Sequence, residues 1–328
     1  MSISIKNIEY TDGWYYGECY DNTPHGIGKF YYNSGSQYKG EFSHGKFSGK
    51  GTFIFSNGDS YTGDFKDDYY HGYGTLINKS KGWSHRGYFK CGYCDGKGIT
   101  FYDNGEVYAG FYSKGYYHGH GMYTYSDGTV YEGDFYKGER HGKGKIKYST
   151  GNAYEGDFRH GKLCGKGTYL FKNGKIYVGD LKDDNFNGFG VMIDKNNGWT
   201  YKGEFKDDLF DGNGTTIYDT GEVYEGSYSK GYFNGQGKYT YIDGSIYIGE
   251  WYDGQRQGKG VIFYADGDIF EGEWYDDKRH GKGRFIFRSS GNSIVGSWEN
   301  GDCNGEGYIE FSDGSRKWGV WEDNEFKS

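Results

Sequence analysis

The chain has 328 residues, of which 62 are Gly and only 1 is Pro, and its formal net charge at pH 7 is −8. Abundant Gly without Pro excludes a collagen-like chain, and an aromatic content of 21% argues against disorder. All hydrophobic residues together reach only 34%, so the chain must bury rings in a thin structure. The negative charge disfavours nucleic acid as a partner, because its phosphates would be repelled.

The N-terminal residues 1–5 have neither the basic nor the apolar segment that begins a secretory signal. No apolar run approaches the roughly 20 residues that span a bilayer. Five cysteines are an odd and sparse set, which fits a reducing compartment better than a disulfide framework. We therefore expect a cytoplasmic protein.

A repeat organises almost the whole chain. Residues 1–14 are expected to form an N-terminal capping strand, residues 15–316 hold thirteen repeats, and residues 317–328 are a truncated half-repeat and the C-terminus. The period is 23 residues, with three steps of 24. Position 0 is the residue two before the Gly of the motif Tyr-x-Gly. It falls at Tyr15, Tyr38, Tyr61, His85, Tyr108, Tyr131, Tyr154, Tyr177, Tyr201, Tyr224, Tyr247, Phe270 and Ile294.

Three positions of the repeat are invariant. Positions 2, 11 and 13 are Gly in all thirteen copies, and positions 4 and 17 are aromatic in eleven. A longer period overlies the first, since KDDYYHGYG at 66–74 recurs as KDDNFNGFG at 182–190, which is 116 residues or five repeats later. The array therefore grew by duplication of a block of five repeats.

The spacing predicts two strands in each repeat. Residues two apart share a face of a strand, so positions 0, 2 and 4 lie on one aromatic face with positions 11, 13, 15 and 17. The intervening positions are polar: position 3 is acidic in nine copies and position 12 is Lys in six. One register that satisfies this parity pairs position 4 with 11 and position 3 with 12, with a two-residue turn at positions 7–8, such as Gly138–Glu139.

The connection between repeats predicts a three-residue hairpin loop that ends in Gly. Such a loop is usually a type I turn closed by a left-handed residue in a bulge, and Gly is preferred there. The extra residue of each 24-residue copy falls in this loop, and the terminal Gly moves with it, to Gly82, Gly198 and Gly291. The structural turn residues of this kind that we single out are Gly58, Gly105, Gly128, Gly174, Gly244 and Gly267.

Because a lone hairpin is barely stable in water, each must pair with its neighbours. The sequence thus predicts an all-β fold, an elongated, twisted, single-layer antiparallel β-meander that resembles a solenoid of hairpins. The Gly positions should leave notches in which rings of adjacent repeats stack.

The repeat YEGDFYKGERHGKGKIKYSTG at 131–151 resembles the MORN repeat, the membrane occupation and recognition nexus. The family hallmark is Tyr-x-Gly-x-Trp/Phe followed by Gly-x-x-His-Gly-x-Gly, and the resemblance extends from residue 15 to about 322. It implies a groove-bearing antiparallel meander that binds a partner segment along its aromatic groove or dimerises through a terminus. Whole-chain arrays are most similar to radial spoke head proteins of the ciliary axoneme and to protist cytoskeletal proteins. The hallmark His is replaced at eight places: Ser48, Asp95, Cys164, Asn187, Asp211, Asn234, Gln257 and Asn304.

No motif indicates catalysis, a cofactor or a metal. Cys91 and Cys94 have C-x-x-C spacing, but a second pair or a thioredoxin-type βαβ context is missing, so a chance position in a turn is the better interpretation. The histidines before Gly-x-Gly recur at least 23 residues apart and would not converge on a metal. The Gly-Lys-Gly triplets lack the phosphate-binding motif with its following helix.

The aromatic face is the candidate site for partners. The simpler alternative is that most of these rings pack on one another between repeats. At the C-terminal end position 4 changes to Trp, and the array ends on a half-repeat whose strand edge is free to add another strand. We therefore expect a partner contact or a homodimer through residues 247–326. The partner-binding candidates are Tyr108, Tyr131, Phe135, Tyr154, Phe158, Tyr224, Tyr228, Tyr247, Trp251, Trp274, Trp298, Trp318 and Trp321.

Three functions follow from these patterns. The leading hypothesis is a non-enzymatic scaffold that holds a helical or extended segment of a partner protein in a ciliary or cortical cytoskeletal complex. The alternative is a phospholipid-tethering module, but a net charge of −8 predicts weak attraction to anionic lipid. A targeting module of an enzyme ranks last, because nothing outside the repeats of this sequence would be that enzyme.

Overall fold

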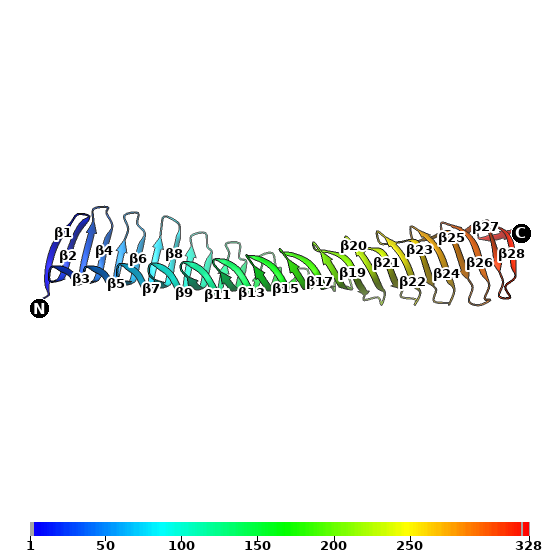
Figure 1. Ribbon diagram of the computed structural model, residues 1–328, viewed down its shortest axis with the longest axis horizontal. Helices are drawn as coiled ribbons and strands as arrows, with labels where there is room; N and C mark the ends of the chain where they lie inside the picture. The colour runs from blue at the N-terminus through cyan, green and yellow to red at the C-terminus, as the bar shows by residue number, and fades with distance from the viewer. Residues whose placement is uncertain (1–2, 323, 328) are drawn as a thin grey trace. The chain divides into compact units, whose positions relative to one another are not determined.

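The computed structural model describes residues 3–322 and 324–327, and all regular structure within them is β-strand. Within each of its two units, consecutive strands are antiparallel neighbours, which confirms the predicted all-β meander of hairpins (Figure 1). The chain divides into two compact units, one up to Leu163 and one from Cys164 onward, which are described separately.

In the first unit each strand pairs with the strand before it and the strand after it, from β1 to β14. The sheet is open, and the described residues place no second layer over it. Its strands are β1 (Ser4–Tyr10), β2 (Gly13–Tyr20), β3 (Thr23–Tyr32), β4 (Gln37–Ser43), β5 (Lys46–Ile54), β6 (Ser60–Lys66), β7 (Tyr69–Asn78), β8 (Trp83–Lys90), β9 (Tyr93–Tyr102), β10 (Val107–Ser113), β11 (Tyr116–Thr124), β12 (Val130–Tyr136), β13 (Glu139–Lys147) and β14 (Ala153–Arg159).

The second unit repeats this organisation from β16 to β29, and β15, which begins two residues before the division, pairs with β16. Its strands are β15 (Lys162–Leu170), β16 (Ile176–Lys182), β17 (Asn185–Asp194), β18 (Trp199–Lys206), β19 (Leu209–Tyr218), β20 (Val223–Ser229), β21 (Tyr232–Thr240), β22 (Ile246–Tyr252), β23 (Gln255–Phe263), β24 (Ile269–Tyr275), β25 (Lys278–Ile286), β26 (Ser293–Glu299), β27 (Asp302–Glu310), β28 (Arg316–Glu322) and β29 (Glu325–Lys327).

The register within a hairpin differs from the predicted one beyond position 2. In the β12–β13 hairpin, positions 0–2 pair with positions 15–13 as predicted, but Phe135 at position 4 then lies opposite Arg140 at position 9. The turn occupies Lys137 and Gly138, whose φ values of +51° and +92° are typical of a type I′ turn. The predicted turn at Gly138–Glu139 is therefore wrong by one residue, because the shift in register was not visible in the repeat.

The predicted pairing of position 4 with 11 and of position 3 with 12 occurs between neighbouring hairpins instead. Phe158 lies opposite Gly142, and Asp157 lies opposite Lys143, whose Nζ is 2.7 Å from the Asp157 Oδ1. Gly142 has a φ of +65°, and this left-handed residue lies in the bulge that shifts the register inside its own hairpin. Position 11 is thus Gly for its backbone conformation and not to make a notch for a ring.

The loops between repeats have the predicted geometry. In the loop after β5, the Phe55 N–H donates to the Asp59 carbonyl at 2.9 Å, and the Gly58 N–H donates to the Phe55 carbonyl at 3.0 Å. The six turn glycines singled out from the sequence have φ values from +86° to +94°. In the three longer loops, Gly82, Gly198 and Gly291 have φ values from +65° to +71°.

A tyrosine lying on two glycines forms the core of ten of the thirteen repeats. Tyr131 is 0% exposed, and a Cβ built on Gly144 would stand 2.5 Å from its Oη. Gly133, on the strand next to that of Gly144, leaves space for the same ring. The Tyr131 hydroxyl donates to the Asp134 carbonyl at 2.8 Å. The notches at positions 2 and 13 are therefore filled by the ring of the same repeat, which gives a single-layer sheet its own core.

The side chain at position 9 covers this tyrosine, a role that the sequence did not reveal. In six hairpins it is a ring that stacks on the position 0 ring at 3.7–3.9 Å, as Tyr117 does on Tyr108. Phe135 at position 4 links neighbouring repeats, since its centroid is 5.1 Å from those of both Tyr108 and Tyr131 in edge-on contacts. Each such pair adds about 0.5–1.5 kcal/mol beyond burial.

Candidate protein-interaction site

Of the thirteen residues predicted to bind a partner, only Trp318 is exposed, at 66%. The other twelve have at most 6% of their surface exposed, because their rings pack on one another in the core. This is the simpler alternative that the sequence left open. A partner role for these twelve stays a prediction, and the described surfaces that remain open are formed by other side chains.

The C-terminal strand edge is partly covered. Residues 320–322 of β28 pair with β29, and the Phe326 ring lies 4.9 Å from the Trp321 ring. The prediction of a free half-repeat edge is therefore wrong for residues 320–322, because residues 325–327 pair with them as a short second strand. A homodimer through this end stays a prediction.

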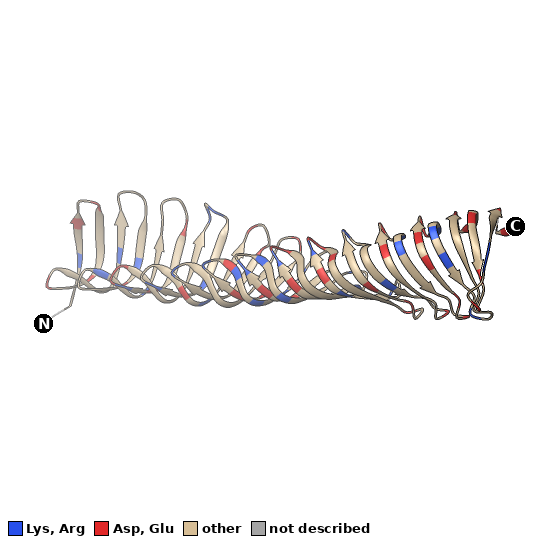
Figure 2. Cartoon of the chain, turned by 45° about the vertical axis from the view of Figure 1, so that its right-hand side comes forward, with Lys and Arg blue, Asp and Glu red and all other residues tan. Residues whose placement is uncertain are grey.

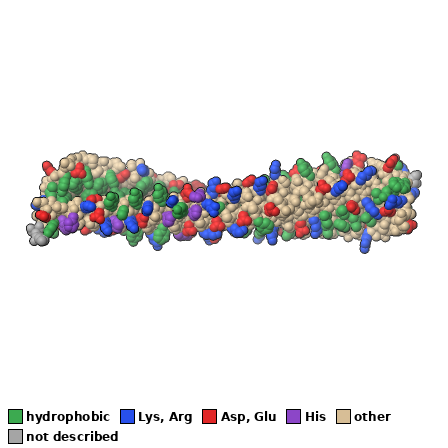
Figure 3. Space-filling model, viewed as in Figure 1, with side chains coloured by type: hydrophobic (Ala, Val, Ile, Leu, Met, Phe, Trp, Pro, Cys, Tyr) green, Lys and Arg blue, Asp and Glu red, His purple; other side chains and the backbone are tan. Residues whose placement is uncertain are grey.

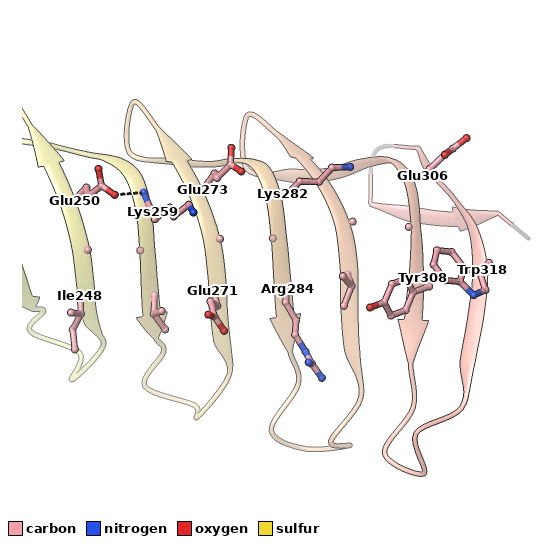
Figure 4. Close-up of a pocket in the computed structure, with 18 of the residues that line it drawn as sticks. Ile248, Glu250, Lys259, Glu271, Glu273, Lys282, Arg284, Glu306, Tyr308 and Trp318 are labelled. Atoms are coloured by element: carbon pink, nitrogen blue, oxygen red, sulfur yellow. Dashed lines mark hydrogen bonds between the residues drawn. The ribbon is translucent and has the colours of Figure 1, made fainter.

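A groove runs across β21–β28 on the face opposite the tyrosines, which we call the outer groove. Its volume is about 1150 Å³. The floor is the backbone of the paired glycines at positions 2 and 13, from Gly249 to Gly319. Side chains at positions 1 and 14 form one wall and side chains at positions 3 and 12 form the other, and Figure 4 shows the two rows on either side of the bare backbone.

The two walls of the outer groove differ in chemistry. The wall at positions 3 and 12 is mostly charged and alternates in sign, with Glu250, Lys259, Glu273 and Lys282 in succession (Figure 4). The other wall is more apolar and consists of Ile248, Val261, Glu271, Arg284, Val295, Tyr308 and Trp318. An amphipathic segment of a protein has the matching pair of faces.

A second groove, the N-terminal aromatic groove, lies in the first unit on the tyrosine side of β1–β7 and has a volume of about 590 Å³. Five rings follow one another along it with centroids 4.5–5.8 Å apart, and we call this series the ring ladder: Tyr10, Phe30, Tyr32, Phe53 and Phe55. Figure 3 shows hydrophobic side chains gathered over the N-terminal hairpins. Sequence reasoning noted the rings at position 17 but did not select these.

His85 takes the place of tyrosine at position 0 in the fourth repeat and is 1% exposed. Its Nδ1 lies 2.9 Å from the Thr100 Oγ1, which lies 2.5 Å from the Tyr112 Oη. Its Nε2 has no hydrogen-bond partner among the described residues. Burial lowers the pKa of His85 to about 4. Burial raises the pKa of the neighbouring Cys94 thiol to about 12, so this cluster indicates a core histidine and not a nucleophilic site.

The described residues contain no group of three or more His, Cys, Asp or Glu side chains that could hold a metal ion. Cys91 and Cys94 are free thiols, and burial raises the pKa of Cys94 to about 12. A thiol with so high a pKa is a poor nucleophile at neutral pH.

We call the face opposite the tyrosines the outer face. Charges of both signs are interleaved along the strands of each unit (Figure 2). Several lie in close pairs across neighbouring hairpins, such as Lys50 with Asp64 at 2.5 Å and Lys143 with Asp157 at 2.7 Å. Within residues 3–322 and 324–327, no helical segment has the length and hydropathy of a membrane span. Paired charges of both signs reduce the attraction of this face for anionic lipid.

Three of the solved structures that this chain resembles are remote likenesses. The TCP10 domain of Danio rerio CPAP has a TM-score of 0.37 and 13% identity, with 63% of this chain and 95% of that chain covered. The SAS-4 (dCPAP) TCP domain of Drosophila melanogaster, in complex with a proline-rich motif of Ana2, has a TM-score of 0.30 and 14% identity, with 61% and 88% covered. Virginiamycin B lyase of Staphylococcus aureus has a TM-score of 0.14 and 12% identity, with 97% and 88% covered. At these TM-scores the likenesses carry no argument.

Comparison with curated proteins gives no significant match. The family model of the MORN repeat, in contrast, matches thirteen consecutive segments that cover most of the chain. They are residues 15–37, 38–60, 61–81, 85–107, 108–130, 131–153, 154–176, 177–199, 201–223, 224–246, 247–269, 270–291 and 295–316. The glycine and ring positions that build each hairpin are those of this repeat, so the chain belongs to the MORN repeat family.

Proposed function

We propose that this protein is a non-enzymatic scaffold that binds segments of partner proteins along its grooves. The observation that supports it best is the outer groove, which has a more apolar wall, a mostly charged wall of alternating sign and the exposed ring of Trp318 at one end. Tryptophan is enriched in binding hot spots, and charges around an apolar centre give specificity. Repeat arrays commonly use such extended surfaces to bind partners.

A matched pair of substitutions tests the outer groove. Ile248 and Val178 both occupy position 1 of their repeats and both are 47% exposed, but only Ile248 lines the groove. We expect Ile248→Glu to lose the proteins that co-purify with the wild-type chain from a native lysate, and Val178→Glu to retain them. Quantitative mass spectrometry would measure both. Equal recovery with the two variants would contradict the proposal.

The proposal extends to a place in a ciliary, radial-spoke-like complex or in the cortical cytoskeleton. Its support is the similarity of whole-chain MORN arrays to axonemal and protist cytoskeletal proteins. We expect a fluorescently tagged chain to concentrate on the axoneme or the cell cortex. A uniform cytoplasmic signal would contradict this part.

Sedimentation with anionic liposomes separates the scaffold from the alternative, a phospholipid-tethering module. The net charge of −8 and the paired charges of the outer face predict that little protein sediments at physiological salt. Sedimentation of most of the protein would favour the tether.

A homodimer through the C-terminal repeats is also a proposal, and its support is the exposed Trp318 on β28. Light scattering of the whole chain and of a chain truncated at residue 246 would test it. We expect the mass to fall from two copies to one on truncation. A monomeric mass for the whole chain would exclude this dimer.

A further inference from the structure

The N-terminal aromatic groove carries uncompensated negative charge. Of the residues that line it, Asp12 and Asp68 are acidic and none is basic. Both carboxylates act on the same residue of the ladder: burial raises the pKa of the Tyr32 hydroxyl, and Asp12 and Asp68 raise the pKa further. A cation that entered this groove would meet aromatic faces and two carboxylates.

The C-terminal repeats show how the same surface is completed. There Asp277 lies at position 7 of its repeat, and the Arg256 Nε is 3.1 Å from the Asp277 Oδ1. The Arg256 guanidinium lies 4.4 Å from the centroid of Trp274. One repeat later Arg279 lies 4.5 Å from the centroid of Trp298 and 5.4 Å from that of Phe285. An arginine therefore packs among the aromatic rings on this face.

Asp68 occupies in the first unit the position that Asp277 occupies in the second. Each accepts a hydrogen bond from the backbone N–H of position 9 in the preceding repeat, from Phe47 at 2.8 Å and from Arg256 at 3.0 Å. Position 9 is thus an arginine beside Asp277 and a phenylalanine beside Asp68. The N-terminal aromatic groove has the carboxylate and the rings of the C-terminal arrangement but lacks its guanidinium.

The spacing of the ring ladder favours an extended ligand. Strands lie about 4.8 Å apart, so β1, β3 and β5, which carry the ladder, follow one another at about 9.6 Å. A polyproline II chain repeats every three residues, or about 9.3 Å, and its side chains would fall into step with the rings.

We propose that the N-terminal aromatic groove binds a proline-rich segment of a partner protein in the polyproline II conformation, with an arginine that lies against the ring ladder and pairs with Asp68. Prolines pack on the rings between Tyr10 and Phe55, and the guanidinium pairs with Asp68 as Arg256 pairs with Asp277 in the second unit, while the Phe47 ring keeps the place of the Arg256 side chain. Asp12 adds to the negative potential of the groove. This inference rests on the proposed scaffold function and specifies one partner chemistry for it.

Fluorescence anisotropy with labelled twelve-residue peptides tests the proposal on the full-length chain. The probe is four copies of Pro-Pro-Arg. Four copies of Pro-Pro-Gln keep the backbone preference without the charge, and four copies of Gly-Gly-Arg keep the charge without the backbone preference. We expect the Pro-Pro-Arg peptide to bind at least about tenfold more tightly than either comparison peptide.

Asp68→Asn removes the charge and keeps the turn. Within this chain Asn324 occupies the same position, and its Oδ1 accepts a hydrogen bond from the Cys303 N–H at 2.8 Å. The matched control is Asp208→Asn, since Asp208 makes the same bond to the Phe186 N–H, at 2.7 Å, outside the groove. We expect Asp68→Asn to weaken binding of the Pro-Pro-Arg peptide about tenfold and Asp208→Asn to leave it unchanged.

Equal affinity of the Asp68→Asn variant and the wild-type chain would overturn the pairing with arginine. If the wild-type chain bound the Gly-Gly-Arg peptide as tightly as the Pro-Pro-Arg peptide, the polyproline II conformation would be overturned. An absence of binding by the Pro-Pro-Arg peptide would overturn the whole inference. The scaffold function is judged separately by the Ile248→Glu and Val178→Glu variants. It stands if partners depend on the outer groove while the peptides fail to bind.

Discussion

Replacement of His85 by tyrosine should stabilise the hairpin formed by β8 and β9. Tyrosine occupies the equivalent position five repeats later, where Tyr201 lies on two glycines beside the same Thr and Tyr pair. Its hydroxyl donates to the Glu204 carbonyl at 2.8 Å. His85→Tyr would add this bond and remove an unpaired buried nitrogen, so we expect a gain of about 2 kcal/mol at pH 7.

The stabilisation gained by His85→Tyr should increase as the pH falls. The pKa of His85 is lowered to about 4 by burial, from its ordinary value of 6.5, so the unfolded chain takes up the proton first. With His85 in place, the free energy of unfolding is therefore at its full value above pH 6.5 and decreases as the pH falls toward 4. Between pH 7 and pH 5 the loss is about 2 kcal/mol. The neighbouring Cys94 and Tyr112 have raised pKa values and do not titrate in this range.

Hydrogen exchange followed by mass spectrometry measures this locally, which suits an array whose repeats need not unfold together. Peptides from residues 83–102 should lose protection between pH 7 and pH 5, after correction for intrinsic exchange, in the wild-type chain and not in His85→Tyr. The reverse change, Tyr201→His, should give residues 199–218 the same sensitivity. An equal pH response of the wild-type and His85→Tyr chains would refute the reasoning.

Three further substitutions test the packing and turn arguments by denaturant unfolding. Gly144→Ala places a Cβ 2.5 Å from the Tyr131 Oη and should cost about 1–3 kcal/mol; a neutral result would contradict the packing of tyrosine on glycine. Gly128→Ala has open space around it but a φ of +88°, so backbone strain alone should cost about 1–2 kcal/mol, and no loss would contradict the left-handed loop. Lys143→Met breaks an ion pair whose lysine is 74% exposed and should cost less than about 1 kcal/mol. A larger loss would show that the pairs on the outer face stabilise the fold.

Local rules made much of the fold predictable from the sequence. The faces of the strands followed from the spacing of ring and glycine positions, and the loops followed from the Gly that moves with each inserted residue, as at Gly82. The register did not follow, because parity permits several pairings. The bulge at Gly142 selects among them, and its sequence signature is the same as that of a glycine needed for close packing.

The binding surfaces were less predictable than the fold. The sequence favoured the tryptophans at position 4, but the sheet folds these rings into the core and leaves Trp318, one residue from the start of its half-repeat, exposed. The N-terminal aromatic groove depends on position 9, where Phe47 stands in place of an arginine. A sequence records that difference, but which side chain covers position 0 becomes visible only once the register is known.

Because each tyrosine is seated on glycines of its own hairpin, a newly duplicated hairpin brings its interior with it. Gene duplication can therefore lengthen or shorten such a protein by whole modules without redesigning its neighbours, as the recurrence of residues 66–74 at 182–190 records. The length of the array and its surface chemistry can then evolve separately. The number of modules sets the length, and a change at position 9, which is Phe47 in one repeat and Arg256 in another, alters the surface.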